Sequence, residues 1–239
     1  MRYRFAENKN FEDFSCGRVI RHGTGNTNFS VRLADEIFMR CMEYIGTLEK
    51  KVRLYDPCCG GGYLLTVLGF LHNDKIGSIR GSDISDNSIS VAADNFNLLT
   101  SEGLSRRRDQ LMKMYIEYGK ESHNQAIGSV KNLSDMLHNN IKSDVFKRDI
   151  LDSNDNAKMN FIADIIITDV PYSNMVSWSN DTPFAIDAML DNLLCGVNDN
   201  TILAVCSDKR QKIYSPGYKR VEKFQTGVRK IEILKKLEQ

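Results

Sequence analysis

Five segments of the chain each run into an aspartate, and one of them continues into three glycines. Gly60 opens the triplet four residues after Asp56, within the stretch Asp-Pro-Cys-Cys-Gly-Gly-Gly-Tyr. The acids that follow the five segments are Asp56, Asp83, Asp149, Asp169 and Asp208. Glycines let a backbone approach a ligand closely, while carboxylates accept hydrogen bonds or attract a cation. We therefore predict a ligand site where these segments converge.

A dinucleotide is the first candidate ligand. Gly60 and Gly62 fit the first two glycines of G-x-G-x-x-G, and Asp83 lies 21 residues after Gly62, where a ribose-binding acid belongs. The third glycine position holds Leu65, however, and Asp56 would face the pyrophosphate. Repulsion between these negative charges disfavours a dinucleotide.

S-adenosylmethionine removes that repulsion, because it has no phosphate and carries an ammonium and a sulfonium. We expect Asp56 to attract its cationic end, directly or through water, and Asp83 to accept hydrogen bonds from both ribose hydroxyls. Asp149 is placed to accept the adenine amino group, while Ile84 or Ile150 packs on the ring. Gly60 and Gly62 let the backbone approach the nucleoside.

A second motif, Asp169-Val170-Pro171-Tyr172, follows the fourth segment. It resembles the [N/D/S]-P-P-[Y/F] signature of methyltransferases that modify nitrogens of bases, with Val170 in place of the first proline. In this interpretation Asp169 and nearby carbonyls accept N–H bonds from the target, Pro171 stiffens the loop, and Tyr172 stacks on a base taken out of its helix.

Basic residues gather in two places. The segment 209–239 contains ten Lys and Arg against three Glu, a net charge of +7, which leaves −6 for residues 1–208 of a chain whose total is +1. Such an asymmetry hints at a polyanionic partner, although a solvated basic surface is the simpler alternative. The residues expected to contact RNA phosphates are Arg106, Arg107, Arg108, Lys209 and Arg210.

The elements that must position these residues follow from periodicity. Strands are predicted at 52–56, 76–84, 143–150, 163–172 and 201–208, and helices at 31–48, 63–72, 85–99 and 184–194. A hairpin is expected around Gly227, and residues 1–30 are expected to be irregular. Strands that alternate with helices predict an α/β, Rossmann-like, doubly wound and mostly parallel sheet, whose ligands bind at the carboxyl ends of the strands.

Composition sets the outer limits. With 239 residues, 41% of them apolar, we expect a single domain over 1–239, with a helical insertion at about 100–142 and a basic C-terminal segment at about 209–239. No apolar run reaches 18 residues and no secretory signal is seen. Six cysteines without a C-x-x-C pair favour reduced thiols in the cytoplasm and argue against bound metal. We expect a monomer that does not bind a membrane.

Several stretches together resemble the AviRa family, the avilamycin-resistance ribosomal RNA methyltransferases. The resemblance runs from about residue 14 to 212, and its most distinctive part is Asp-Pro-Cys-Cys-Gly-Gly-Gly-Tyr-Leu-Leu-Thr-Val-Leu-Gly at 56–69. It also includes 29–38, the start of the insertion at 103–108, 164–172 and 207–213. The resemblance implies a Rossmann-like methyltransferase that acts on a guanine of large-subunit ribosomal RNA, with N1 as the methylated atom.

The sequence thus predicts an S-adenosylmethionine-dependent methyltransferase of ribosomal RNA, alone or in a ribosomal subunit. Asp169 would orient the guanine and assist loss of its proton, and Tyr172 would stack on it. Two alternatives remain open: an adenine-N6 or protein N-methyltransferase, because such signatures are shared, and a non-catalytic S-adenosylmethionine-binding protein associated with RNA.

Overall fold

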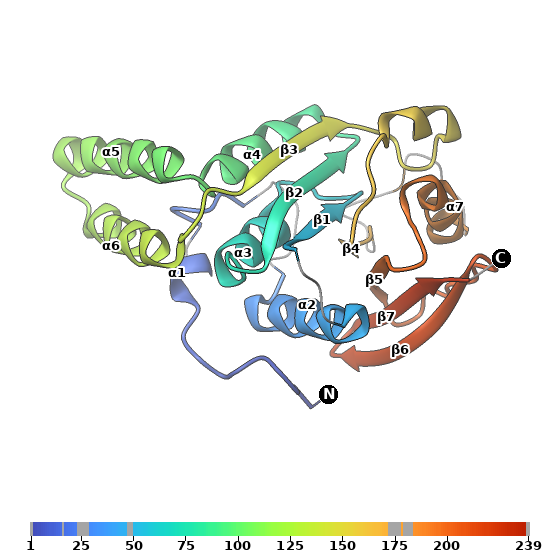
Figure 1. Cartoon of the computed structure of the whole chain (residues 1–239). Helices are drawn as coiled ribbons and strands as arrows, with labels where there is room; N and C mark the ends of the chain where they lie inside the picture. Colours follow the sequence, from blue (N-terminus) through green and yellow to red (C-terminus); the bar gives the residue numbers. More distant parts are fainter. Residues whose placement is uncertain are drawn as a thin grey trace.

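A seven-stranded sheet forms the centre of the computed structural model, which describes residues 2–15, 17–22, 29–46, 50–171, 178 and 184–237. The strand order is β3-β2-β1-β4-β5-β7-β6 (Figure 1). The strands are β1 (Val52–Asp56), β2 (Ile76–Asp83), β3 (Lys142–Lys147), β4 (Ile165–Asp169), β5 (Ile202–Asp208), β6 (Tyr218–Thr226) and β7 (Arg229–Lys236). The first five pair in parallel, and β7 runs antiparallel to both β5 and β6. The predicted doubly wound sheet and terminal hairpin are confirmed.

Helices cover both faces of the sheet. They are α1 (Glu12–Ser15), α2 (Val31–Ile45), α3 (Tyr63–Leu71), α4 (Asp86–Asn97), α5 (Ser101–Tyr118), α6 (Glu121–Met136) and α7 (Ala185–Leu193), with short 3-10 turns η1 (Ser153–Lys158) and η2 (Leu194–Gly196). No helix in the described part of the chain is both long and apolar enough to cross a membrane.

Two apolar cores result from the alternation of side chains along the strands. Ile165 and Ile167 of β4 belong to the core on the face covered by α2, α3 and α4, whereas Ile166 belongs to the core beneath α7. All three isoleucines are at most 1% exposed. A continuous apolar strand of this kind is typical of a parallel sheet covered on both faces.

Side-chain caps fix where three of the helices begin. The hydroxyls of Ser30, Ser85 and Thr100 accept bonds from backbone N–H groups in the first turns of α2, α4 and α5. Such caps satisfy donors that a helix start leaves without intrahelical partners. The cap at Ser85 starts α4 two residues after the acid that ends β2, so the chain turns away from the sheet edge directly behind Asp83.

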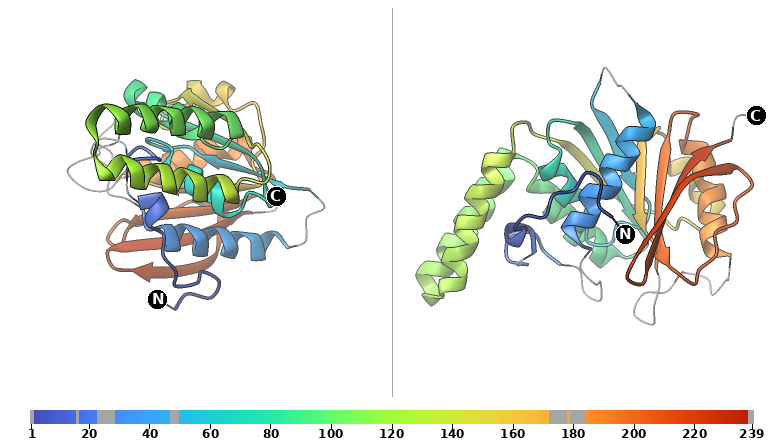
Figure 2. Two further views of the ribbon diagram at one scale, coloured as in Figure 1. Left: turned by 90° about the vertical axis from the view of Figure 1, so that its left-hand side faces the viewer. Right: turned by 90° about the horizontal axis from the view of Figure 1, so that it is seen from below.

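The α5–α6 insertion projects from the β3 side of the sheet as an antiparallel pair (Figures 1 and 2). Gly119, with a φ of 62°, ends α5 and allows the sharp turn into α6. The pair is joined to the body through Leu104, Leu111 and other buried residues at its base. The far half of α5 exposes Ile116 and Tyr118, at 78% and 56%.

The N-terminal segment is more ordered than the sequence indicated. The expectation of an irregular start was wrong at Glu12–Ser15, where α1 forms and packs Phe14 into the core. Earlier in the chain, the Glu36 carboxylate of α2 accepts the backbone N–H groups of Arg4, Phe5 and Ala6 at 2.8–2.9 Å. Sequence periodicity could reveal neither α1 nor the bonds to Glu36. Four residues make only one helical turn, and the donors to Glu36 are backbone N–H groups, which every residue type except proline carries.

Glu36 is fully buried and forms an ion pair with Arg40 at 2.6 Å. Burial acts to raise the pKa of Glu36, but three backbone N–H donors and the Arg40 guanidinium hold that pKa below its ordinary value of 4.5. We expect Glu36→Gln to lower the free energy of unfolding by about 1.5–3 kcal/mol, because a neutral amide replaces one of the two carboxylates that pair with the buried Arg40. Urea denaturation at pH 7 measures this loss.

The lowered pKa of Glu36 determines how the stability that this residue contributes depends on pH. A lowered pKa in the folded state stabilises the protein above the unfolded-state value, and this stabilisation disappears as pH falls through the folded-state value. The difference in free energy of unfolding between wild type and Glu36→Gln should therefore become smaller below about pH 4.5. Glu43→Gln is the matched control, because its ion pair with Arg4 is exposed and should contribute about 0–1 kcal/mol. Equal losses for both variants would contradict the assignment.

Candidate functional site

Acids meet at the carboxyl edge of the sheet. Asp56, Asp83 and Asp169 are the last residues of three neighbouring strands, β1, β2 and β4. The site prediction from the sequence placed these acids together, and the strand order brings them to one edge. Asp149 lies two residues beyond the end of β3, which stops at Lys147 rather than at the predicted position 150.

The glycine turn after β1 is held by both β2 and α4. Gly60 has a φ of 53° and donates its N–H to Asp83 Oδ2 at 2.9 Å. Gly62, with a φ of 70°, leaves no room for a side chain, because an added Cβ would lie 2.7 Å from the Phe96 ring. The buried Asn95 amide donates to the carbonyl of Gly61 at 2.7 Å. The glycine turn is therefore held in one conformation, and the Asp83 carboxylate accepts the Gly60 N–H within it.

Asp56 is the most deeply buried of these acids, at 2% exposure. Its Oδ1 accepts the N–H of Cys58 at 2.9 Å. Burial raises the pKa of Asp56 to about 7, and the charges of Asp169 and Asp83 act in the same direction against the Cys58 hydrogen bond. A carboxyl group in this state ionises readily when a cation arrives beside it.

Asp83 combines fixed orientation with free acceptor capacity. Its two oxygens accept the N–H groups of Gly60 and Ser85, both at 2.9 Å. A carboxylate has about four acceptor positions, so two remain for a ligand. Ile84, which follows it, is 47% exposed and offers apolar surface, whereas Ile150 is only 5% exposed and packs in the core beneath α7.

Asp149 is oriented by its own loop. Its N–H donates to Asp155 Oδ2 at 3.1 Å, and its Oδ1 accepts the N–H of Leu151 at 2.9 Å. The half-buried side chain stands next to Arg148, whose guanidinium is 1% exposed and donates to Asn156 at 2.9 Å. The turn after β3 is thus built around two charged residues rather than an apolar strand end.

Asp169 has a partner that the sequence did not indicate. Its Oδ2 lies 3.3 Å from Nη2 of Arg229, the first residue of β7, and the Asp169 side chain is 24% exposed. Pro171 accepts a bond from Gln211 Nε2 at 3.4 Å, which joins the segment after β4 to the segment after β5. Tyr172, the predicted stacking residue, lies outside the described residues.

Comparison with known proteins identifies the family. The sequence model of the family described as rRNA methyltransferase AviRa matches residues 1–229. The chain belongs to this family. It is 30% identical over 234 residues to the Streptomyces viridochromogenes 23S rRNA (guanine(2535)-N(1))-methyltransferase, covering 95% of this chain and 93% of that one.

Solved structures agree with the family assignment. The rRNA methyltransferase AviRa from Streptomyces viridochromogenes at 1.5 Å superposes with a TM-score of 0.88 and 29% identity, covering 98% of this chain and 96% of that one. A Listeria monocytogenes protein described as a putative class I S-adenosylmethionine-dependent methyltransferase shares the fold, with a TM-score of 0.53 and 16% identity, over 91% of this chain and 63% of that one. The AviRa-family chain is therefore an rRNA methyltransferase, and its family and fold imply the use of S-adenosylmethionine.

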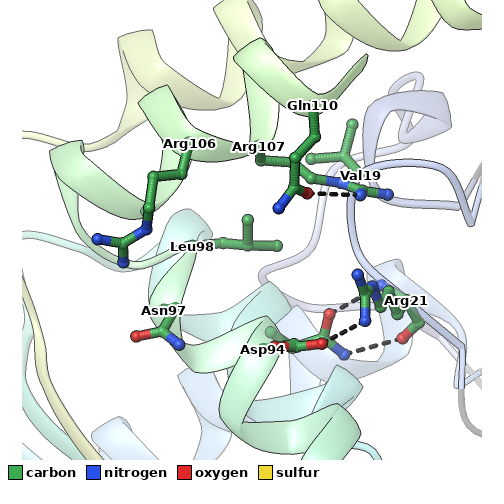
Figure 3. Close-up of a pocket in the computed structure, with 10 residues that line it drawn as sticks. Val19, Arg21, Asp94, Asn97, Leu98, Arg106, Arg107 and Gln110 are labelled. Carbon is green, nitrogen blue, oxygen red and sulfur yellow. Dashed lines mark hydrogen bonds and ion pairs between the residues drawn. The ribbon is translucent and has the colours of Figure 1, made fainter. Parts of the chain in front are cut away.

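The arginine triplet of this AviRa-family enzyme divides into different roles. Arg107 donates to the carbonyl of Arg18 and, at 3.1 Å, to Gln110. Arg108 pairs with Asp109 at 3.1 Å on the helix surface. Arg106 is exposed and lines a pocket of about 80 Å³ between α4, α5 and the segment around Arg21 (Figure 3). Arg107 therefore also has a structural role, since it ties the N-terminal segment to α5.

The basic C-terminal segment is likewise partly engaged within the protein. Arg210 pairs with Asp208 at 2.8 Å, and the backbone N–H of Lys209 donates to Val228 at 2.9 Å. Both side chains remain exposed beside the carboxyl end of β5. They lie at the same edge of the sheet as Asp169, so the predicted RNA contacts and the predicted catalytic acid are neighbours along the β4–β5 pair.

Two residues of the site escaped the sequence analysis, namely Asn95 and Arg229. Asn95 lies in a helix whose periodicity gives no sign that its amide binds Gly61 and the backbone of Arg21. Arg229 follows the Gly227 turn, and its place opposite Asp208 could be inferred only once β7 is known to pair with β5. The missing information is the strand pairing order for Arg229, and the packing of α4 against the glycine turn and the Arg21 segment for Asn95.

The raised pKa of Asp56 generates a prediction on stability. A folded-state pKa of about 7, above the ordinary 3.8, means that the folded protein holds a proton more tightly, so stability falls as pH rises from about 4 to about 7. Asp56→Asn resembles the protonated acid and cannot ionise. We expect it to match wild type near pH 4 and to become progressively more stable than wild type up to pH 7, with a constant difference above.

Urea denaturation of both proteins between pH 4 and 8 measures that difference. Asp74→Asn, at an exposed acid far from the glycine turn, is the control for the change in net charge. Parallel stability curves for Asp56→Asn and wild type would show that Asp56 ionises normally.

Proposed function

We propose that the enzyme transfers the methyl group of S-adenosylmethionine to N1 of a guanine in large-subunit ribosomal RNA. The observation that carries this proposal is the set of three acids at the carboxyl edge of the sheet around the glycine turn, namely Asp56, Asp83 and Asp149. The named activity of the 30% identical relative supports the target atom. The motif Asp169-Val170-Pro171-Tyr172 beside this set supports a planar nitrogen substrate.

The residues fit the cofactor by charge and by remaining acceptor capacity. Asp83 keeps two acceptor positions for the ribose hydroxyls, and the buried Asp56 gains stability beside the cationic end of the ligand. Asp149 is assigned to the adenine amino group and Ile84 to the ring face, since Ile84 is the more exposed of the two isoleucines. The same acids oppose a pyrophosphate, which argues against a dinucleotide.

When bound, S-adenosylmethionine supplies the electrophilic methyl group. Asp169 accepts an N–H bond from the guanine and orients its ring, and Tyr172 is assigned to stack on the flipped base. Positioning of this kind accounts in general for roughly 7–11 kcal/mol of a barrier. Phosphate contacts are assigned to four exposed cations, Arg106, Arg108, Lys209 and Arg210, and to Arg107, which is half-buried and also donates to the carbonyl of Arg18.

Cofactor affinity should depend on pH through Asp56. Below pH 7 this acid is protonated in the free enzyme, and a cation at its side favours the ionised form, so binding releases a proton. We expect affinity to rise with pH up to about 7 and then level off. Titration calorimetry at pH 6 and 8, each in two buffers of different ionisation enthalpy, measures both affinity and proton release.

Two variants separate charge from hydrogen bonding. Asp56→Asn should lose the pH dependence of binding. Asp83→Ala should keep it but bind S-adenosylmethionine at least tenfold more weakly, because it loses ribose hydrogen bonds worth about 1.5–3 kcal/mol. Unchanged affinity in Asp83→Ala, or tight NAD binding by wild type, would overturn the cofactor assignment.

The activity is tested by single-turnover methylation of unmodified 23S rRNA with tritiated cofactor, followed by nuclease mapping and product mass. We expect 1-methylguanine from wild type and a rate lower by a hundredfold or more for Asp169→Asn, about 3 kcal/mol of transition-state stabilisation. Cofactor affinity should stay unchanged in that variant. Label on adenine or on protein, or full activity of Asp169→Asn, would refute the proposal at the corresponding step.

A further inference from the structure

Arg229 reaches the predicted catalytic acid from a strand that is not its neighbour. Asp169 of β4 pairs with Cys206 of β5, and Cys206 pairs with Ile231 of β7. Arg229 lies two residues before Ile231 and so shares its face of the sheet. Its side chain crosses β5 to place Nη2 at 3.3 Å from Asp169 Oδ2.

The guanidinium is held in place by rigid surroundings. Its Cζ lies 5.0 Å from the centroid of the Phe29 ring, and Phe29 is 5% exposed. The turn before β7 is tied to the end of β5 by the bond from the Lys209 N–H to Val228 at 2.9 Å. Arg229 retains 16% of its side-chain exposure and Asp169 24%, so a ligand can still reach this pair. An arginine stacked on a ring and anchored in a sheet is suited to directional hydrogen bonding.

The charges around the pair are unequal. Asp56 and Asp83 add two carboxylates on the β1 and β2 side of Asp169, while Asp208 and Arg210 pair with each other at the end of β5. Arg229 is therefore the cation that borders Asp169, on the side of this acid away from Asp56 and Asp83. A base entering here meets an acceptor, Asp169, directly beside a donor, Arg229.

We propose that Arg229 donates to O6 of the target guanine while Asp169 accepts its N1–H, so that the pair reads one edge of the base. This inference rests on the proposed function. Guanine presents a donor at N1 next to an acceptor at O6, and adenine presents the reverse order, an acceptor at N1 next to an amino donor. The arginine thus favours guanine and opposes adenine.

The same contact lowers the barrier. As N1 loses its proton, the electron pair left on N1 forms the new N–C bond while the methyl carbon–sulfur bond breaks and its electron pair leaves with the sulfur. The N1 proton passes to the Asp169 carboxylate and then to water. As that proton leaves, negative charge develops on O6, and a fixed cation at O6 stabilises it at the moment it appears.

Single-turnover methylation of 23S rRNA tests this role with Arg229→Gln and Arg229→Lys. We expect a loss of at least a hundredfold for glutamine and a smaller loss for lysine, which keeps the charge but not the planar fork. The rate of Arg229→Gln should rise more steeply with pH than that of wild type, because the base must then lose its proton without help. Arg220→Gln is the control, since Arg220 lies on the same hairpin and pairs with Glu232 at 2.8 Å; its rate should stay within twofold of wild type.

A double variant distinguishes direct contact from positioning of the acid. If Arg229 acts only by orienting Asp169, then adding Arg229→Gln to Asp169→Asn costs nothing further. Direct contact with O6 predicts a further loss of at least tenfold. Wild-type rate and pH profile in Arg229→Gln, or no further loss in the double variant, would overturn the inference while leaving the proposed function intact. Failure of wild type to methylate guanine N1 would instead remove the proposed function, and this inference with it.

Discussion

The concentration of carboxylates at one edge of a parallel sheet is the constraint on which the rest of the molecule depends. Parallel strands present their carboxyl ends together, so the acids that end β1, β2 and β4 are forced into proximity. Burial, with a smaller contribution from the charges of Asp169 and Asp83, raises the pKa of Asp56, so ionising this acid in the free protein costs free energy. The fold offsets part of that cost with backbone donors at Cys58 and Gly60 and with the cation of Arg229. A cationic ligand would offset more of it, so the same repulsion that weakens the free protein favours binding.

The glycine turn shows how this edge is coupled to elements far from it. One bond joins Gly60 to Asp83, so the shape of the turn and the orientation of the acid are set together. Asn95 then connects the turn to the backbone of Arg21, which forms an ion pair with Asp94 in the pocket that Arg106 lines (Figure 3). The segment that contacts the insertion is thus linked to the glycine turn by the hydrogen bonds of the Asn95 side chain.

Much of this architecture could be predicted from the sequence, because apolar runs, caps and strand-end acids are local signals. The β strands and the α2, α3, α4 and α7 helices follow from periodicity, and the grouping of the acids follows from the rule that parallel strands end at one edge. The contacts that could not be predicted join residues that are far apart in the sequence. Arg229 and Asp169 are 60 residues apart and meet only because β7 inserts antiparallel between β5 and β6. Glu36 likewise binds three backbone N–H groups, and a backbone donor leaves no mark in residue type.

The basic C-terminal segment illustrates why net charge overstates the affinity for RNA. Within the described hairpin, Arg229 forms an ion pair with Asp169. The buried Lys230 pairs with Glu232 at 2.9 Å, and Arg220 pairs with the same glutamate. A cation already paired inside the fold must give up that partner before it contacts phosphate. Within the described part of 209–239, the exposed side chains outside such ion pairs, Lys209, Lys219 and Lys223 among them, are fewer than the sequence count of ten suggests. Counterion release scales with the phosphates that are actually neutralised, so the net charge of +7 overstates how many cations of this segment are available to a phosphate backbone.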